Sequence, residues 1–217
     1  MSPLFYAHPL SSYCQKVLIA LYENDTRFTY RPLQDDGVAA ELKALWPINR
    51  FPVLVDAGRT VLESSIIIEH LDIHHPGRVR LVPADPGAAL EVRMLDRLFD
   101  NYVMTPQGRI VFDVIRPPEH RDPYGVAEAR TMLETSYRWL DERMRGREWA
   151  AGDHFSLADC AAAPALLYAH WTHPIDASLG HLHAYRRRLL ARPSYARALA
   201  EARPFRQYFP LPIPAGE

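Results

Sequence analysis

Two adjacent hydroxyl side chains, Ser11 and Ser12, follow a short apolar run at 4–7 and precede the helical pattern QKVLIALYEN. A hydroxyl at the start of a helix can donate a hydrogen bond to a bound thiolate, and the positive end of the helix dipole favours the same anion. Serines in this position also act as ordinary helix caps. Tyr6, at the end of the apolar run, supplies a competing hydroxyl. We predict thiol activation by Ser11 or Ser12, with Tyr6 as a further candidate.

Cys14 invites a redox interpretation, but its spacing favours a structural role. Cys14, Val17, Leu18 and Leu21 fall at i, i+3, i+4 and i+7, which is one apolar helical stripe. The sequence has no CxxC pair, and its only other cysteine is Cys160. Two cysteines are too few for a disulfide framework or a thiolate metal site, so we predict a core role for Cys14 and a reducing, cytoplasmic setting.

The segment LESSIIIEHL at 62–71 suits the head group of an α-amino acid. With Ser64 or Ser65 as N-cap, the first-turn N–H groups and the helix dipole would bind a carboxylate. Glu63 beside it could hold the ammonium group. The structural alternative is that Ser64 only caps the helix and Glu63 only favours its start.

Pro52 opens an apolar strand in FPVLVD at 51–56. Proline at the first position of a strand costs no ladder hydrogen bond, and trans is the ordinary state of such a bond. The strand, helix and strand before it and the hairpin after it favour a cis Phe51–Pro52 bond instead. A cis bond would turn the backbone N–H and C=O of Phe51 toward an extended peptide ligand.

A small sheet must bring these residues together. Strands at 4–7 and 28–31 flank the helix that follows Ser12, a helix is predicted at 39–46, and a hairpin at 53–62 leads into the helix that starts at Ser64. Breaker residues crowd the next stretch, and helical spacing then recurs at 88–115, 125–145, 156–171 and 179–202. We predict an α+β domain of order βαβ-α-ββα at 1–76, a linker at 77–87 and an all-α helical bundle at 88–217 with an extended Pro-rich tail.

Composition excludes several classes of partner. The formal net charge is -1, so no global field would hold nucleic acid. No apolar stretch is long enough for a membrane span. His170 and His173 share a helical face, but a metal site needs more than two ligands, and we predict no metal. Ser156 and Asp159 form a capping-box variant, for which Asp159→Ala should lower stability by about 1 kcal/mol.

The order SSYCQKVLIAL, WPINRFPVLVD, VLESSIIIEHL, LVPADP, FSLADC resembles the glutathione transferase family over 4–202. The resemblance implies a thioredoxin-like first domain and a cis Pro52. It also implies that the Phe51 backbone binds the cysteinyl part of glutathione and that Glu63 and Ser64 hold its γ-glutamyl head. Arg50 sits where relatives place a residue near the glycine carboxylate.

Ser11 matches the catalytic serine of the tau and zeta classes and the cysteine of the omega class. The resemblance therefore implies a transferase with glutathione as co-substrate, acting on a small electrophile in detoxification, and a homodimer. Tyr13 replaces the zeta-type cysteine, and Trp46 replaces the asparagine that usually precedes the proline, so the class stays open.

An acceptor pocket is expected between the domains, lined from the helix after the linker. The candidates are Tyr102, Met104, Arg109 and Phe112, which could equally belong to the bundle core. Two other functions remain as alternatives. One is thiol-disulfide exchange or isomerisation with glutathione, and the other is a non-catalytic adaptor that kept the fold.

Overall fold

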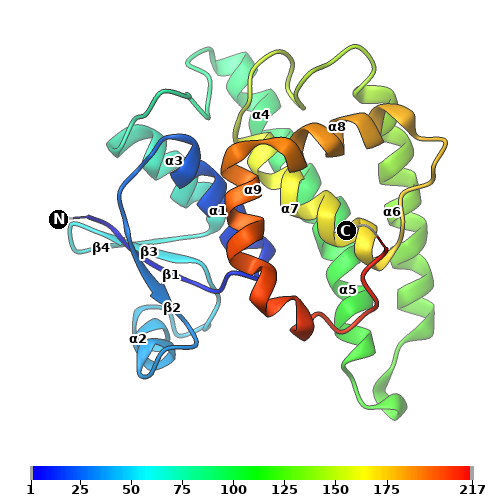
Figure 1. The fold of residues 1–217 in the computed structure, drawn as a ribbon, viewed down its shortest axis with the longest axis horizontal. Helices are drawn as coiled ribbons and strands as arrows, with labels where there is room; N and C mark the ends of the chain where they lie inside the picture. The colour runs from blue at the N-terminus through cyan, green and yellow to red at the C-terminus, as the bar shows by residue number, and fades with distance from the viewer. Residues whose placement is uncertain (1, 216–217) are drawn as a thin grey trace.

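The computed structural model describes residues 2–215, and its first part is built around a four-stranded sheet of order β2-β1-β3-β4 (Figure 1). The strands are β1 (Leu4–Ala7), β2 (Thr29–Pro32), β3 (Val53–Asp56) and β4 (Arg59–Leu62). β1 runs parallel to β2 and antiparallel to β3, with Phe5 opposite both Tyr30 and Leu54. β3 and β4 form the predicted hairpin.

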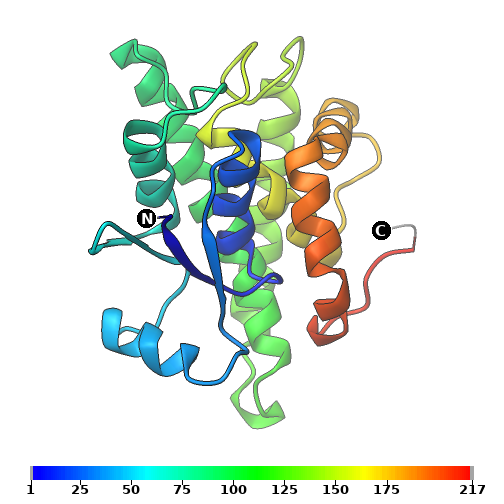
Figure 2. The same cartoon turned by 60° about the vertical axis from the view of Figure 1, so that its left-hand side comes forward.

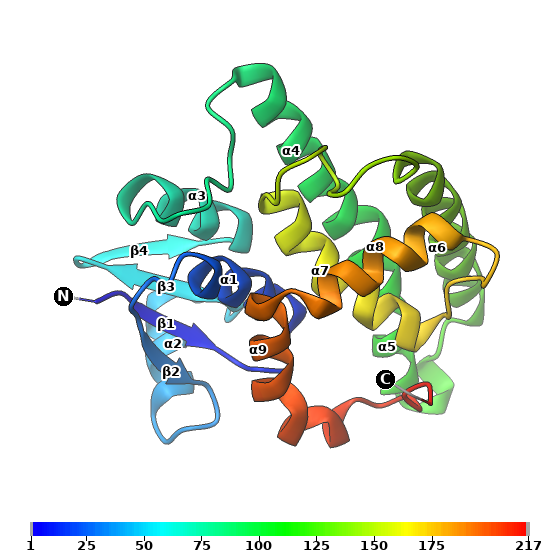
Figure 3. The same cartoon turned by 45° about the horizontal axis from the view of Figure 1, so that its top comes forward.

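The two faces of the sheet bury different residues because side chains alternate along a strand. Phe5 and Ala7 belong to the main core, beneath α1 (Ser12–Glu23) and α3 (Ser64–His74). Tyr6 points to the other face and packs with residues of α2 (Val38–Leu45) in a smaller cluster. Figure 3 shows α1 and α3 on one side of the sheet and α2 on the other.

The rest of the described chain is helical. Its elements are α4 (Pro86–Leu98), the π-helical segment η1 (Phe99–Met104), α5 (Thr105–Val114), the 3-10 turn η2 (Pro118–His120), α6 (Pro123–Arg143), α7 (Leu157–Thr172), α8 (Gly180–Ala191), α9 (Pro193–Ala202) and the 3-10 helix η3 (Arg203–Tyr208). The predicted α+β unit followed by an all-helical unit is confirmed. The predicted domain limits at 76 and 88 stay a prediction.

One apolar core joins the two parts. α7 is buried along nearly its whole length, and α1 packs against both α7 and α9 (Figure 2). The main cluster accordingly runs from Phe5 in the sheet to Tyr195 in α9 without a break. The cleft described below is therefore held between surfaces that share a core.

Two predicted helical stretches and the predicted extended tail differ from the structure. The stretch 88–115 is continuous but passes through the π-helical η1. The stretch 179–202 is divided at Arg192, whose extended backbone precedes Pro193, because proline disfavours a helical residue before it. The tail is not extended from Arg203, because η3 continues to Tyr208.

The capping box that begins α7 is confirmed, and it carries more bonds than a cap alone. The backbone N–H of Ser156 donates to the Asp159 carboxylate at 2.9 Å, and the Ser156 hydroxyl donates to it at 3.1 Å. The Ala150 N–H and the Tyr185 hydroxyl donate to its other oxygen, at 2.9 and 2.6 Å. Asp159 is fully buried, so it ties three separate segments together at the start of α7.

No helix among residues 2–215 has the length and apolar character needed to cross a membrane.

Candidate functional site

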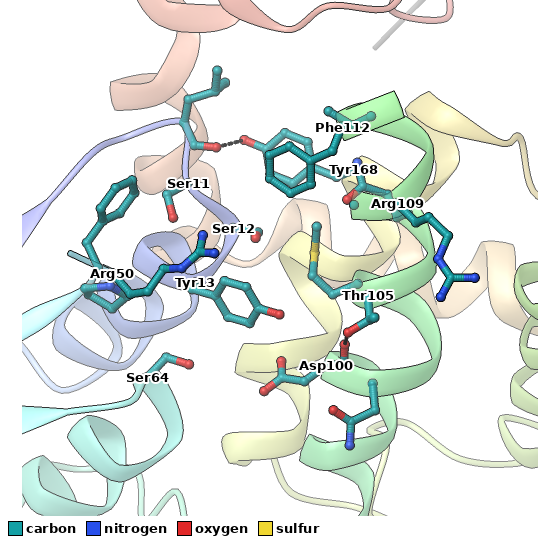
Figure 4. Close-up of a pocket in the computed structure, with 18 of the residues that line it drawn as sticks. Ser11, Ser12, Tyr13, Arg50, Ser64, Asp100, Thr105, Arg109, Phe112 and Tyr168 are labelled. Carbon is teal, nitrogen blue, oxygen red and sulfur yellow. Dashed lines mark hydrogen bonds between the residues drawn. The ribbon is translucent and has the colours of Figure 1, made fainter. Parts of the chain in front are cut away.

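A cleft of about 940 Å³ lies between the carboxyl end of β1 and the helical part (Figure 4). From the first part it is lined by Ser11, Ser12, Tyr13, Trp46, Asn49, Arg50, Phe51, Pro52, Glu63 and Ser64. From the second part it is lined by Arg97, Asp100, Asn101, Met104, Thr105, Gln107, Arg109, Phe112 and Tyr168, and from the tail by Tyr208, Phe209 and Pro210. The structure thus brings together three separated segments of the first hundred residues, as predicted.

Ser11 is the N-cap of α1 and faces the cleft (Figure 4). Its Oγ accepts the backbone N–H of Cys14 at 3.4 Å, which leaves the hydroxyl proton to be donated elsewhere. Ser12 is the first helical residue and also lines the cleft. Both predicted serines therefore lie at the positive end of the α1 dipole.

Tyr6 is not part of the cleft. Because its side chain emerges from the α2 face of the sheet, its hydroxyl donates to Glu41 at 3.0 Å. Burial, followed by the bond to Glu41, raises the pKa of Tyr6. The structure thus removes Tyr6 from the candidates for thiol activation.

A tyrosine from the helical part fixes the loop that carries Ser11. The Tyr168 hydroxyl, on α7, donates to the carbonyl of Leu10 at 2.7 Å and accepts from Gln15 Nε2 at 2.9 Å. The same Gln15 amide donates to the carbonyl of Pro9 at 2.9 Å. This pair of side chains, which sequence reasoning missed, holds the turn immediately before Ser11.

The Phe51–Pro52 peptide bond is cis, as predicted. Two non-glycine residues of the cleft, Asn49 and Glu63, have left-handed backbones with φ of 57° and 68°. A positive φ is uncommon for Glu, whereas Asn adopts it more readily, and such conformations concentrate at functional sites.

Glu63, not Ser64, occupies the cap position of α3, which corrects the predicted cap. The left-handed turn at Glu63 carries the chain from β4 directly into the helix, so Ser64 becomes the first helical residue. Ser64 is buried and Glu63 is exposed, and both still line the cleft.

A network of buried charged residues borders the cleft beside Ser64. The Lys16 side chain is 1 % exposed, and its Nζ lies 2.5 Å from Asp96 Oδ1 and 2.9 Å from Asp100 Oδ2. Ser65 receives a bond from Lys16 at 3.0 Å and donates to Asp96 at 2.8 Å. Arg97 closes the network with bonds to both carboxylates. These residues come from α1, α3, α4 and η1, so the network joins the two parts of the molecule where they meet the cleft.

This network also shapes the electrostatics of the cleft. Burial raises the pKa of Asp100, although Lys16 opposes the shift. Burial, and then the nearby Asp100 carboxylate, raises the pKa of Tyr13 to about 12. Tyr13 lines the cleft between Arg50 and Asp100, and it stays a neutral hydrogen-bond donor at physiological pH (Figure 4).

Three of the four predicted acceptor residues line the cleft, namely Met104, Arg109 and Phe112. Tyr102 does not: its side chain is exposed, and its carbonyl accepts a bond from Ser136 Oγ at 2.9 Å. Tyr102 lies within η1, where the wider π-helical turn changes which residues share a face.

Neither cysteine contributes to the cleft. Cys14 and Cys160 are fully buried. Burial raises the pKa of the Cys14 thiol to about 12 and also raises that of Cys160. Both are thus held as thiols in the core, and thiol-disulfide exchange through Cys14 is not favoured.

Known proteins match this chain over most of its length. The model of the glutathione S-transferase N-terminal domain matches residues 5–79, and that of the C-terminal domain matches residues 103–193. A glutathione S-transferase-like protein of Fusarium is 29% identical over 167 residues, which is 75% of each chain. A probable maleylacetoacetate isomerase of Caenorhabditis elegans is 26% identical over 171 residues, covering 77% of this chain and 78% of the relative.

The fold has equally clear counterparts among solved structures. The structure of a glutathione S-transferase from Methylobacillus flagellatus, with glutathione bound, superposes with a TM-score of 0.81 at 24% identity, over 91% of this chain and 98% of that one. The sheet topology, the cis Pro52 and the two domain matches together show that the chain belongs to the glutathione transferase family.

Proposed function

We propose that this protein is an active glutathione transferase in which Ser11 stabilises the thiolate of glutathione for attack on a small electrophile. The observation that carries the proposal is the position of the Ser11 hydroxyl, which faces the cleft at the N-terminus of α1. A donated hydrogen bond and the helix dipole both favour a thiolate there, so both lower the pKa of a bound thiol.

The remaining polar groups suit the rest of glutathione. Ser64, at the start of α3, offers first-turn N–H groups to the γ-glutamyl carboxylate, and Glu63 offers a carboxylate to its ammonium. The backbone of Phe51 pairs with the cysteinyl residue in strand-like fashion, and the Arg50 guanidinium attracts the glycine carboxylate. The three segments together fix the sulfur beside Ser11.

The chemical step needs only a nucleophile held near its target. The thiolate sulfur forms a bond to the electrophilic carbon, and a leaving group departs with its electrons, or a proton from water completes an addition. The thiol proton passes to solvent. No metal is required. Met104 and Phe112 give the acceptor side an apolar wall, and Tyr13 can donate to an oxygen that becomes negative during attack.

The protein is proposed to act as a cytoplasmic homodimer. Free buried thiols fit a reducing compartment, which also supplies reduced glutathione. Large apolar side chains are exposed on α3 and α4, including Ile66 at 53%, Leu90 at 67% and Met94 at 46%. An apolar face of this kind is typical of a surface that a second protein copy covers.

The function is tested by kinetics with glutathione and an activated aryl chloride. Ser11→Ala should lower kcat/KM by about 10 to 100-fold, the value of one hydrogen bond to a charged group. Ser12→Ala is the matched control, because it removes a neighbouring hydroxyl from the same helix end. If both variants keep full turnover, the assignment of Ser11 is wrong.

A further inference from the structure

Two histidines and an aspartate converge away from the cleft. Asp56 is the last residue of β3, His70 lies in α3, and His75 directly follows α3. His70 Nε2 is 2.9 Å from Asp56 Oδ2, and His75 Nε2 is 2.7 Å from the same oxygen. The potential ligand atoms of this Asp56–His70–His75 cluster all lie within 4.8 Å of one another.

No other group of three such side chains occurs among residues 2–215. The cluster is thus specific to this place among the described residues. Its residues come from the C-terminal end of β3 and from the C-terminal end of α3. The fold therefore holds them close together before any ligand binds.

Burial gives the cluster a closed side and an open side. The side chains of Asp56 and His70 are 11% and 9% exposed, whereas that of His75 is 29% exposed. Burial alone would raise the pKa of Asp56, but the hydrogen bonds from His75 and His70 outweigh it and lower that pKa. The carboxylate is thus charged at neutral pH and faces two imidazole nitrogens.

We propose that the Asp56–His70–His75 cluster binds one zinc-type divalent cation, with water at its open position. Two imidazole nitrogens and one carboxylate oxygen are a ligand set that Zn²⁺ uses with a fourth position open to solvent. The cation takes the place of the hydrogen bonds between the two nitrogens and the carboxylate.

The geometry needs only a small adjustment. Metal-ligand bonds near 2.0 Å in a tetrahedral site put ligand atoms about 3.3 Å apart, so each imidazole must withdraw from Asp56 by roughly half an ångström. His74 packs its ring against that of His70, with centroids 4.4 Å apart, and this contact limits how far His70 can turn away. The cation would therefore clamp the end of β3 to the end of α3.

The cluster is separate from the proposed reaction. β3 and α3 both start at the cleft, next to Pro52 and at Ser64, and both end at the cluster. None of the three ligands lines the cleft, and His75 lies about 16 Å along α3 from Ser64, so the cation takes no part in the chemistry at Ser11. The proposal does not rest on transferase activity.

The test is a calorimetric titration of Zn²⁺ into the full-length chain, without a histidine tag and after treatment with a chelator. One equivalent of Zn²⁺ should bind, and His70→Gln and His75→Gln should each weaken binding at least tenfold. His120→Gln and His154→Gln are the controls, because both histidines are exposed and lie in other segments. When Co²⁺ replaces Zn²⁺, the wild type should show the intense visible absorption of a four-coordinate site. Neither cluster variant should show it.

Circular dichroism and glutathione affinity establish that the cluster variants are folded. If Zn²⁺ binds equally well to His70→Gln, His75→Gln and the controls, its ligands lie elsewhere and the proposal is wrong. If the wild type takes up no stoichiometric Zn²⁺, the cluster is only a hydrogen-bonded anchor for the helix end, and the proposal is equally overturned.

Discussion

In the proposed function, Ser11 combines a structural and a chemical role in a single side chain. Its oxygen caps α1 by accepting the Cys14 N–H, and its proton stays available for an anion in the cleft. Ser12 and Tyr6 carry the same functional group, but Tyr6 is committed to Glu41 on the opposite face of the sheet. The position of each hydroxyl in the fold, and not the residue type, therefore decides which of them can reach a thiol in the cleft.

Both cysteines should be inert in the native protein. Iodoacetamide alkylates thiolates, and burial raises the pKa of Cys14 to about 12 and that of Cys160 as well. Mass spectrometry of the intact protein should therefore find no adduct after an hour at pH 7.5, and two adducts when urea is present. Rapid native labelling of Cys14 would contradict its place in the core and revive the thiol-exchange alternative.

Cleft-lining residues next to a recognisable local pattern could be predicted from the sequence. Ser11 precedes a helix, Pro52 opens a strand, and Glu63 and Ser64 begin a helix, so each has a local signal. Tyr168 and Asp100 have none, because helical periodicity does not reveal which distant loop a buried side chain will contact. Tyr102 was placed wrongly for the related reason that a π-helical segment has no distinctive composition.

At the scale of elements, Asp159 should contribute more to the free energy of unfolding than a helix cap does. Asp159→Ala leaves the buried donors of Ala150, Ser156 and Tyr185 without their acceptor. We expect the free energy of unfolding to fall by roughly 3 to 5 kcal/mol, which exceeds the value predicted from capping alone. Urea denaturation measures the change.

Ser156→Ala is the matched control for that prediction. It removes one hydroxyl from the same cap and should cost about 1 kcal/mol. Glutathione affinity should change in neither variant, because neither residue lines the cleft. Equal losses of stability in the two variants would show that Asp159 acts only as a cap.

Most elements followed from their residue patterns, and the exceptions have identifiable causes. β1 and β3 are buried on both faces, so each appears in the sequence as a short continuous apolar run. The break at Pro193 and the 3-10 helix from Arg203 were missed because proline is also accepted in the first turn of a helix. The predicted helix at 179–202 runs on through Pro193, whereas the tail after Arg203 is predicted to be extended, yet in both places proline lies in the first turn of a new element.

At the scale of the whole molecule, the exposed apolar face of α3 and α4 is expected to form the homodimer contact. Leu90 and Met94 lie one helical turn apart on α4, and Ile66 is exposed on α3. The double variant Leu90→Glu, Met94→Glu should convert a dimer into a monomer, as measured by light scattering at micromolar concentration, because it buries carboxylates in an apolar contact.

Tyr124→Glu is the control for the dimer prediction, since Tyr124 is 74% exposed on α6, away from that face. A wild-type protein that is monomeric would contradict the proposed assembly. So would a double variant that remains dimeric.

The ionisation of bound glutathione tests the central claim most directly. Thiolate absorbance in the ultraviolet, followed against pH with saturating glutathione, reports the pKa of the bound thiol. We expect that pKa to lie at least about one unit below that of free glutathione, and Ser11→Ala to return it upward by about one to two units. An unshifted thiol, an unchanged pKa in Ser11→Ala or no binding of glutathione would contradict the account.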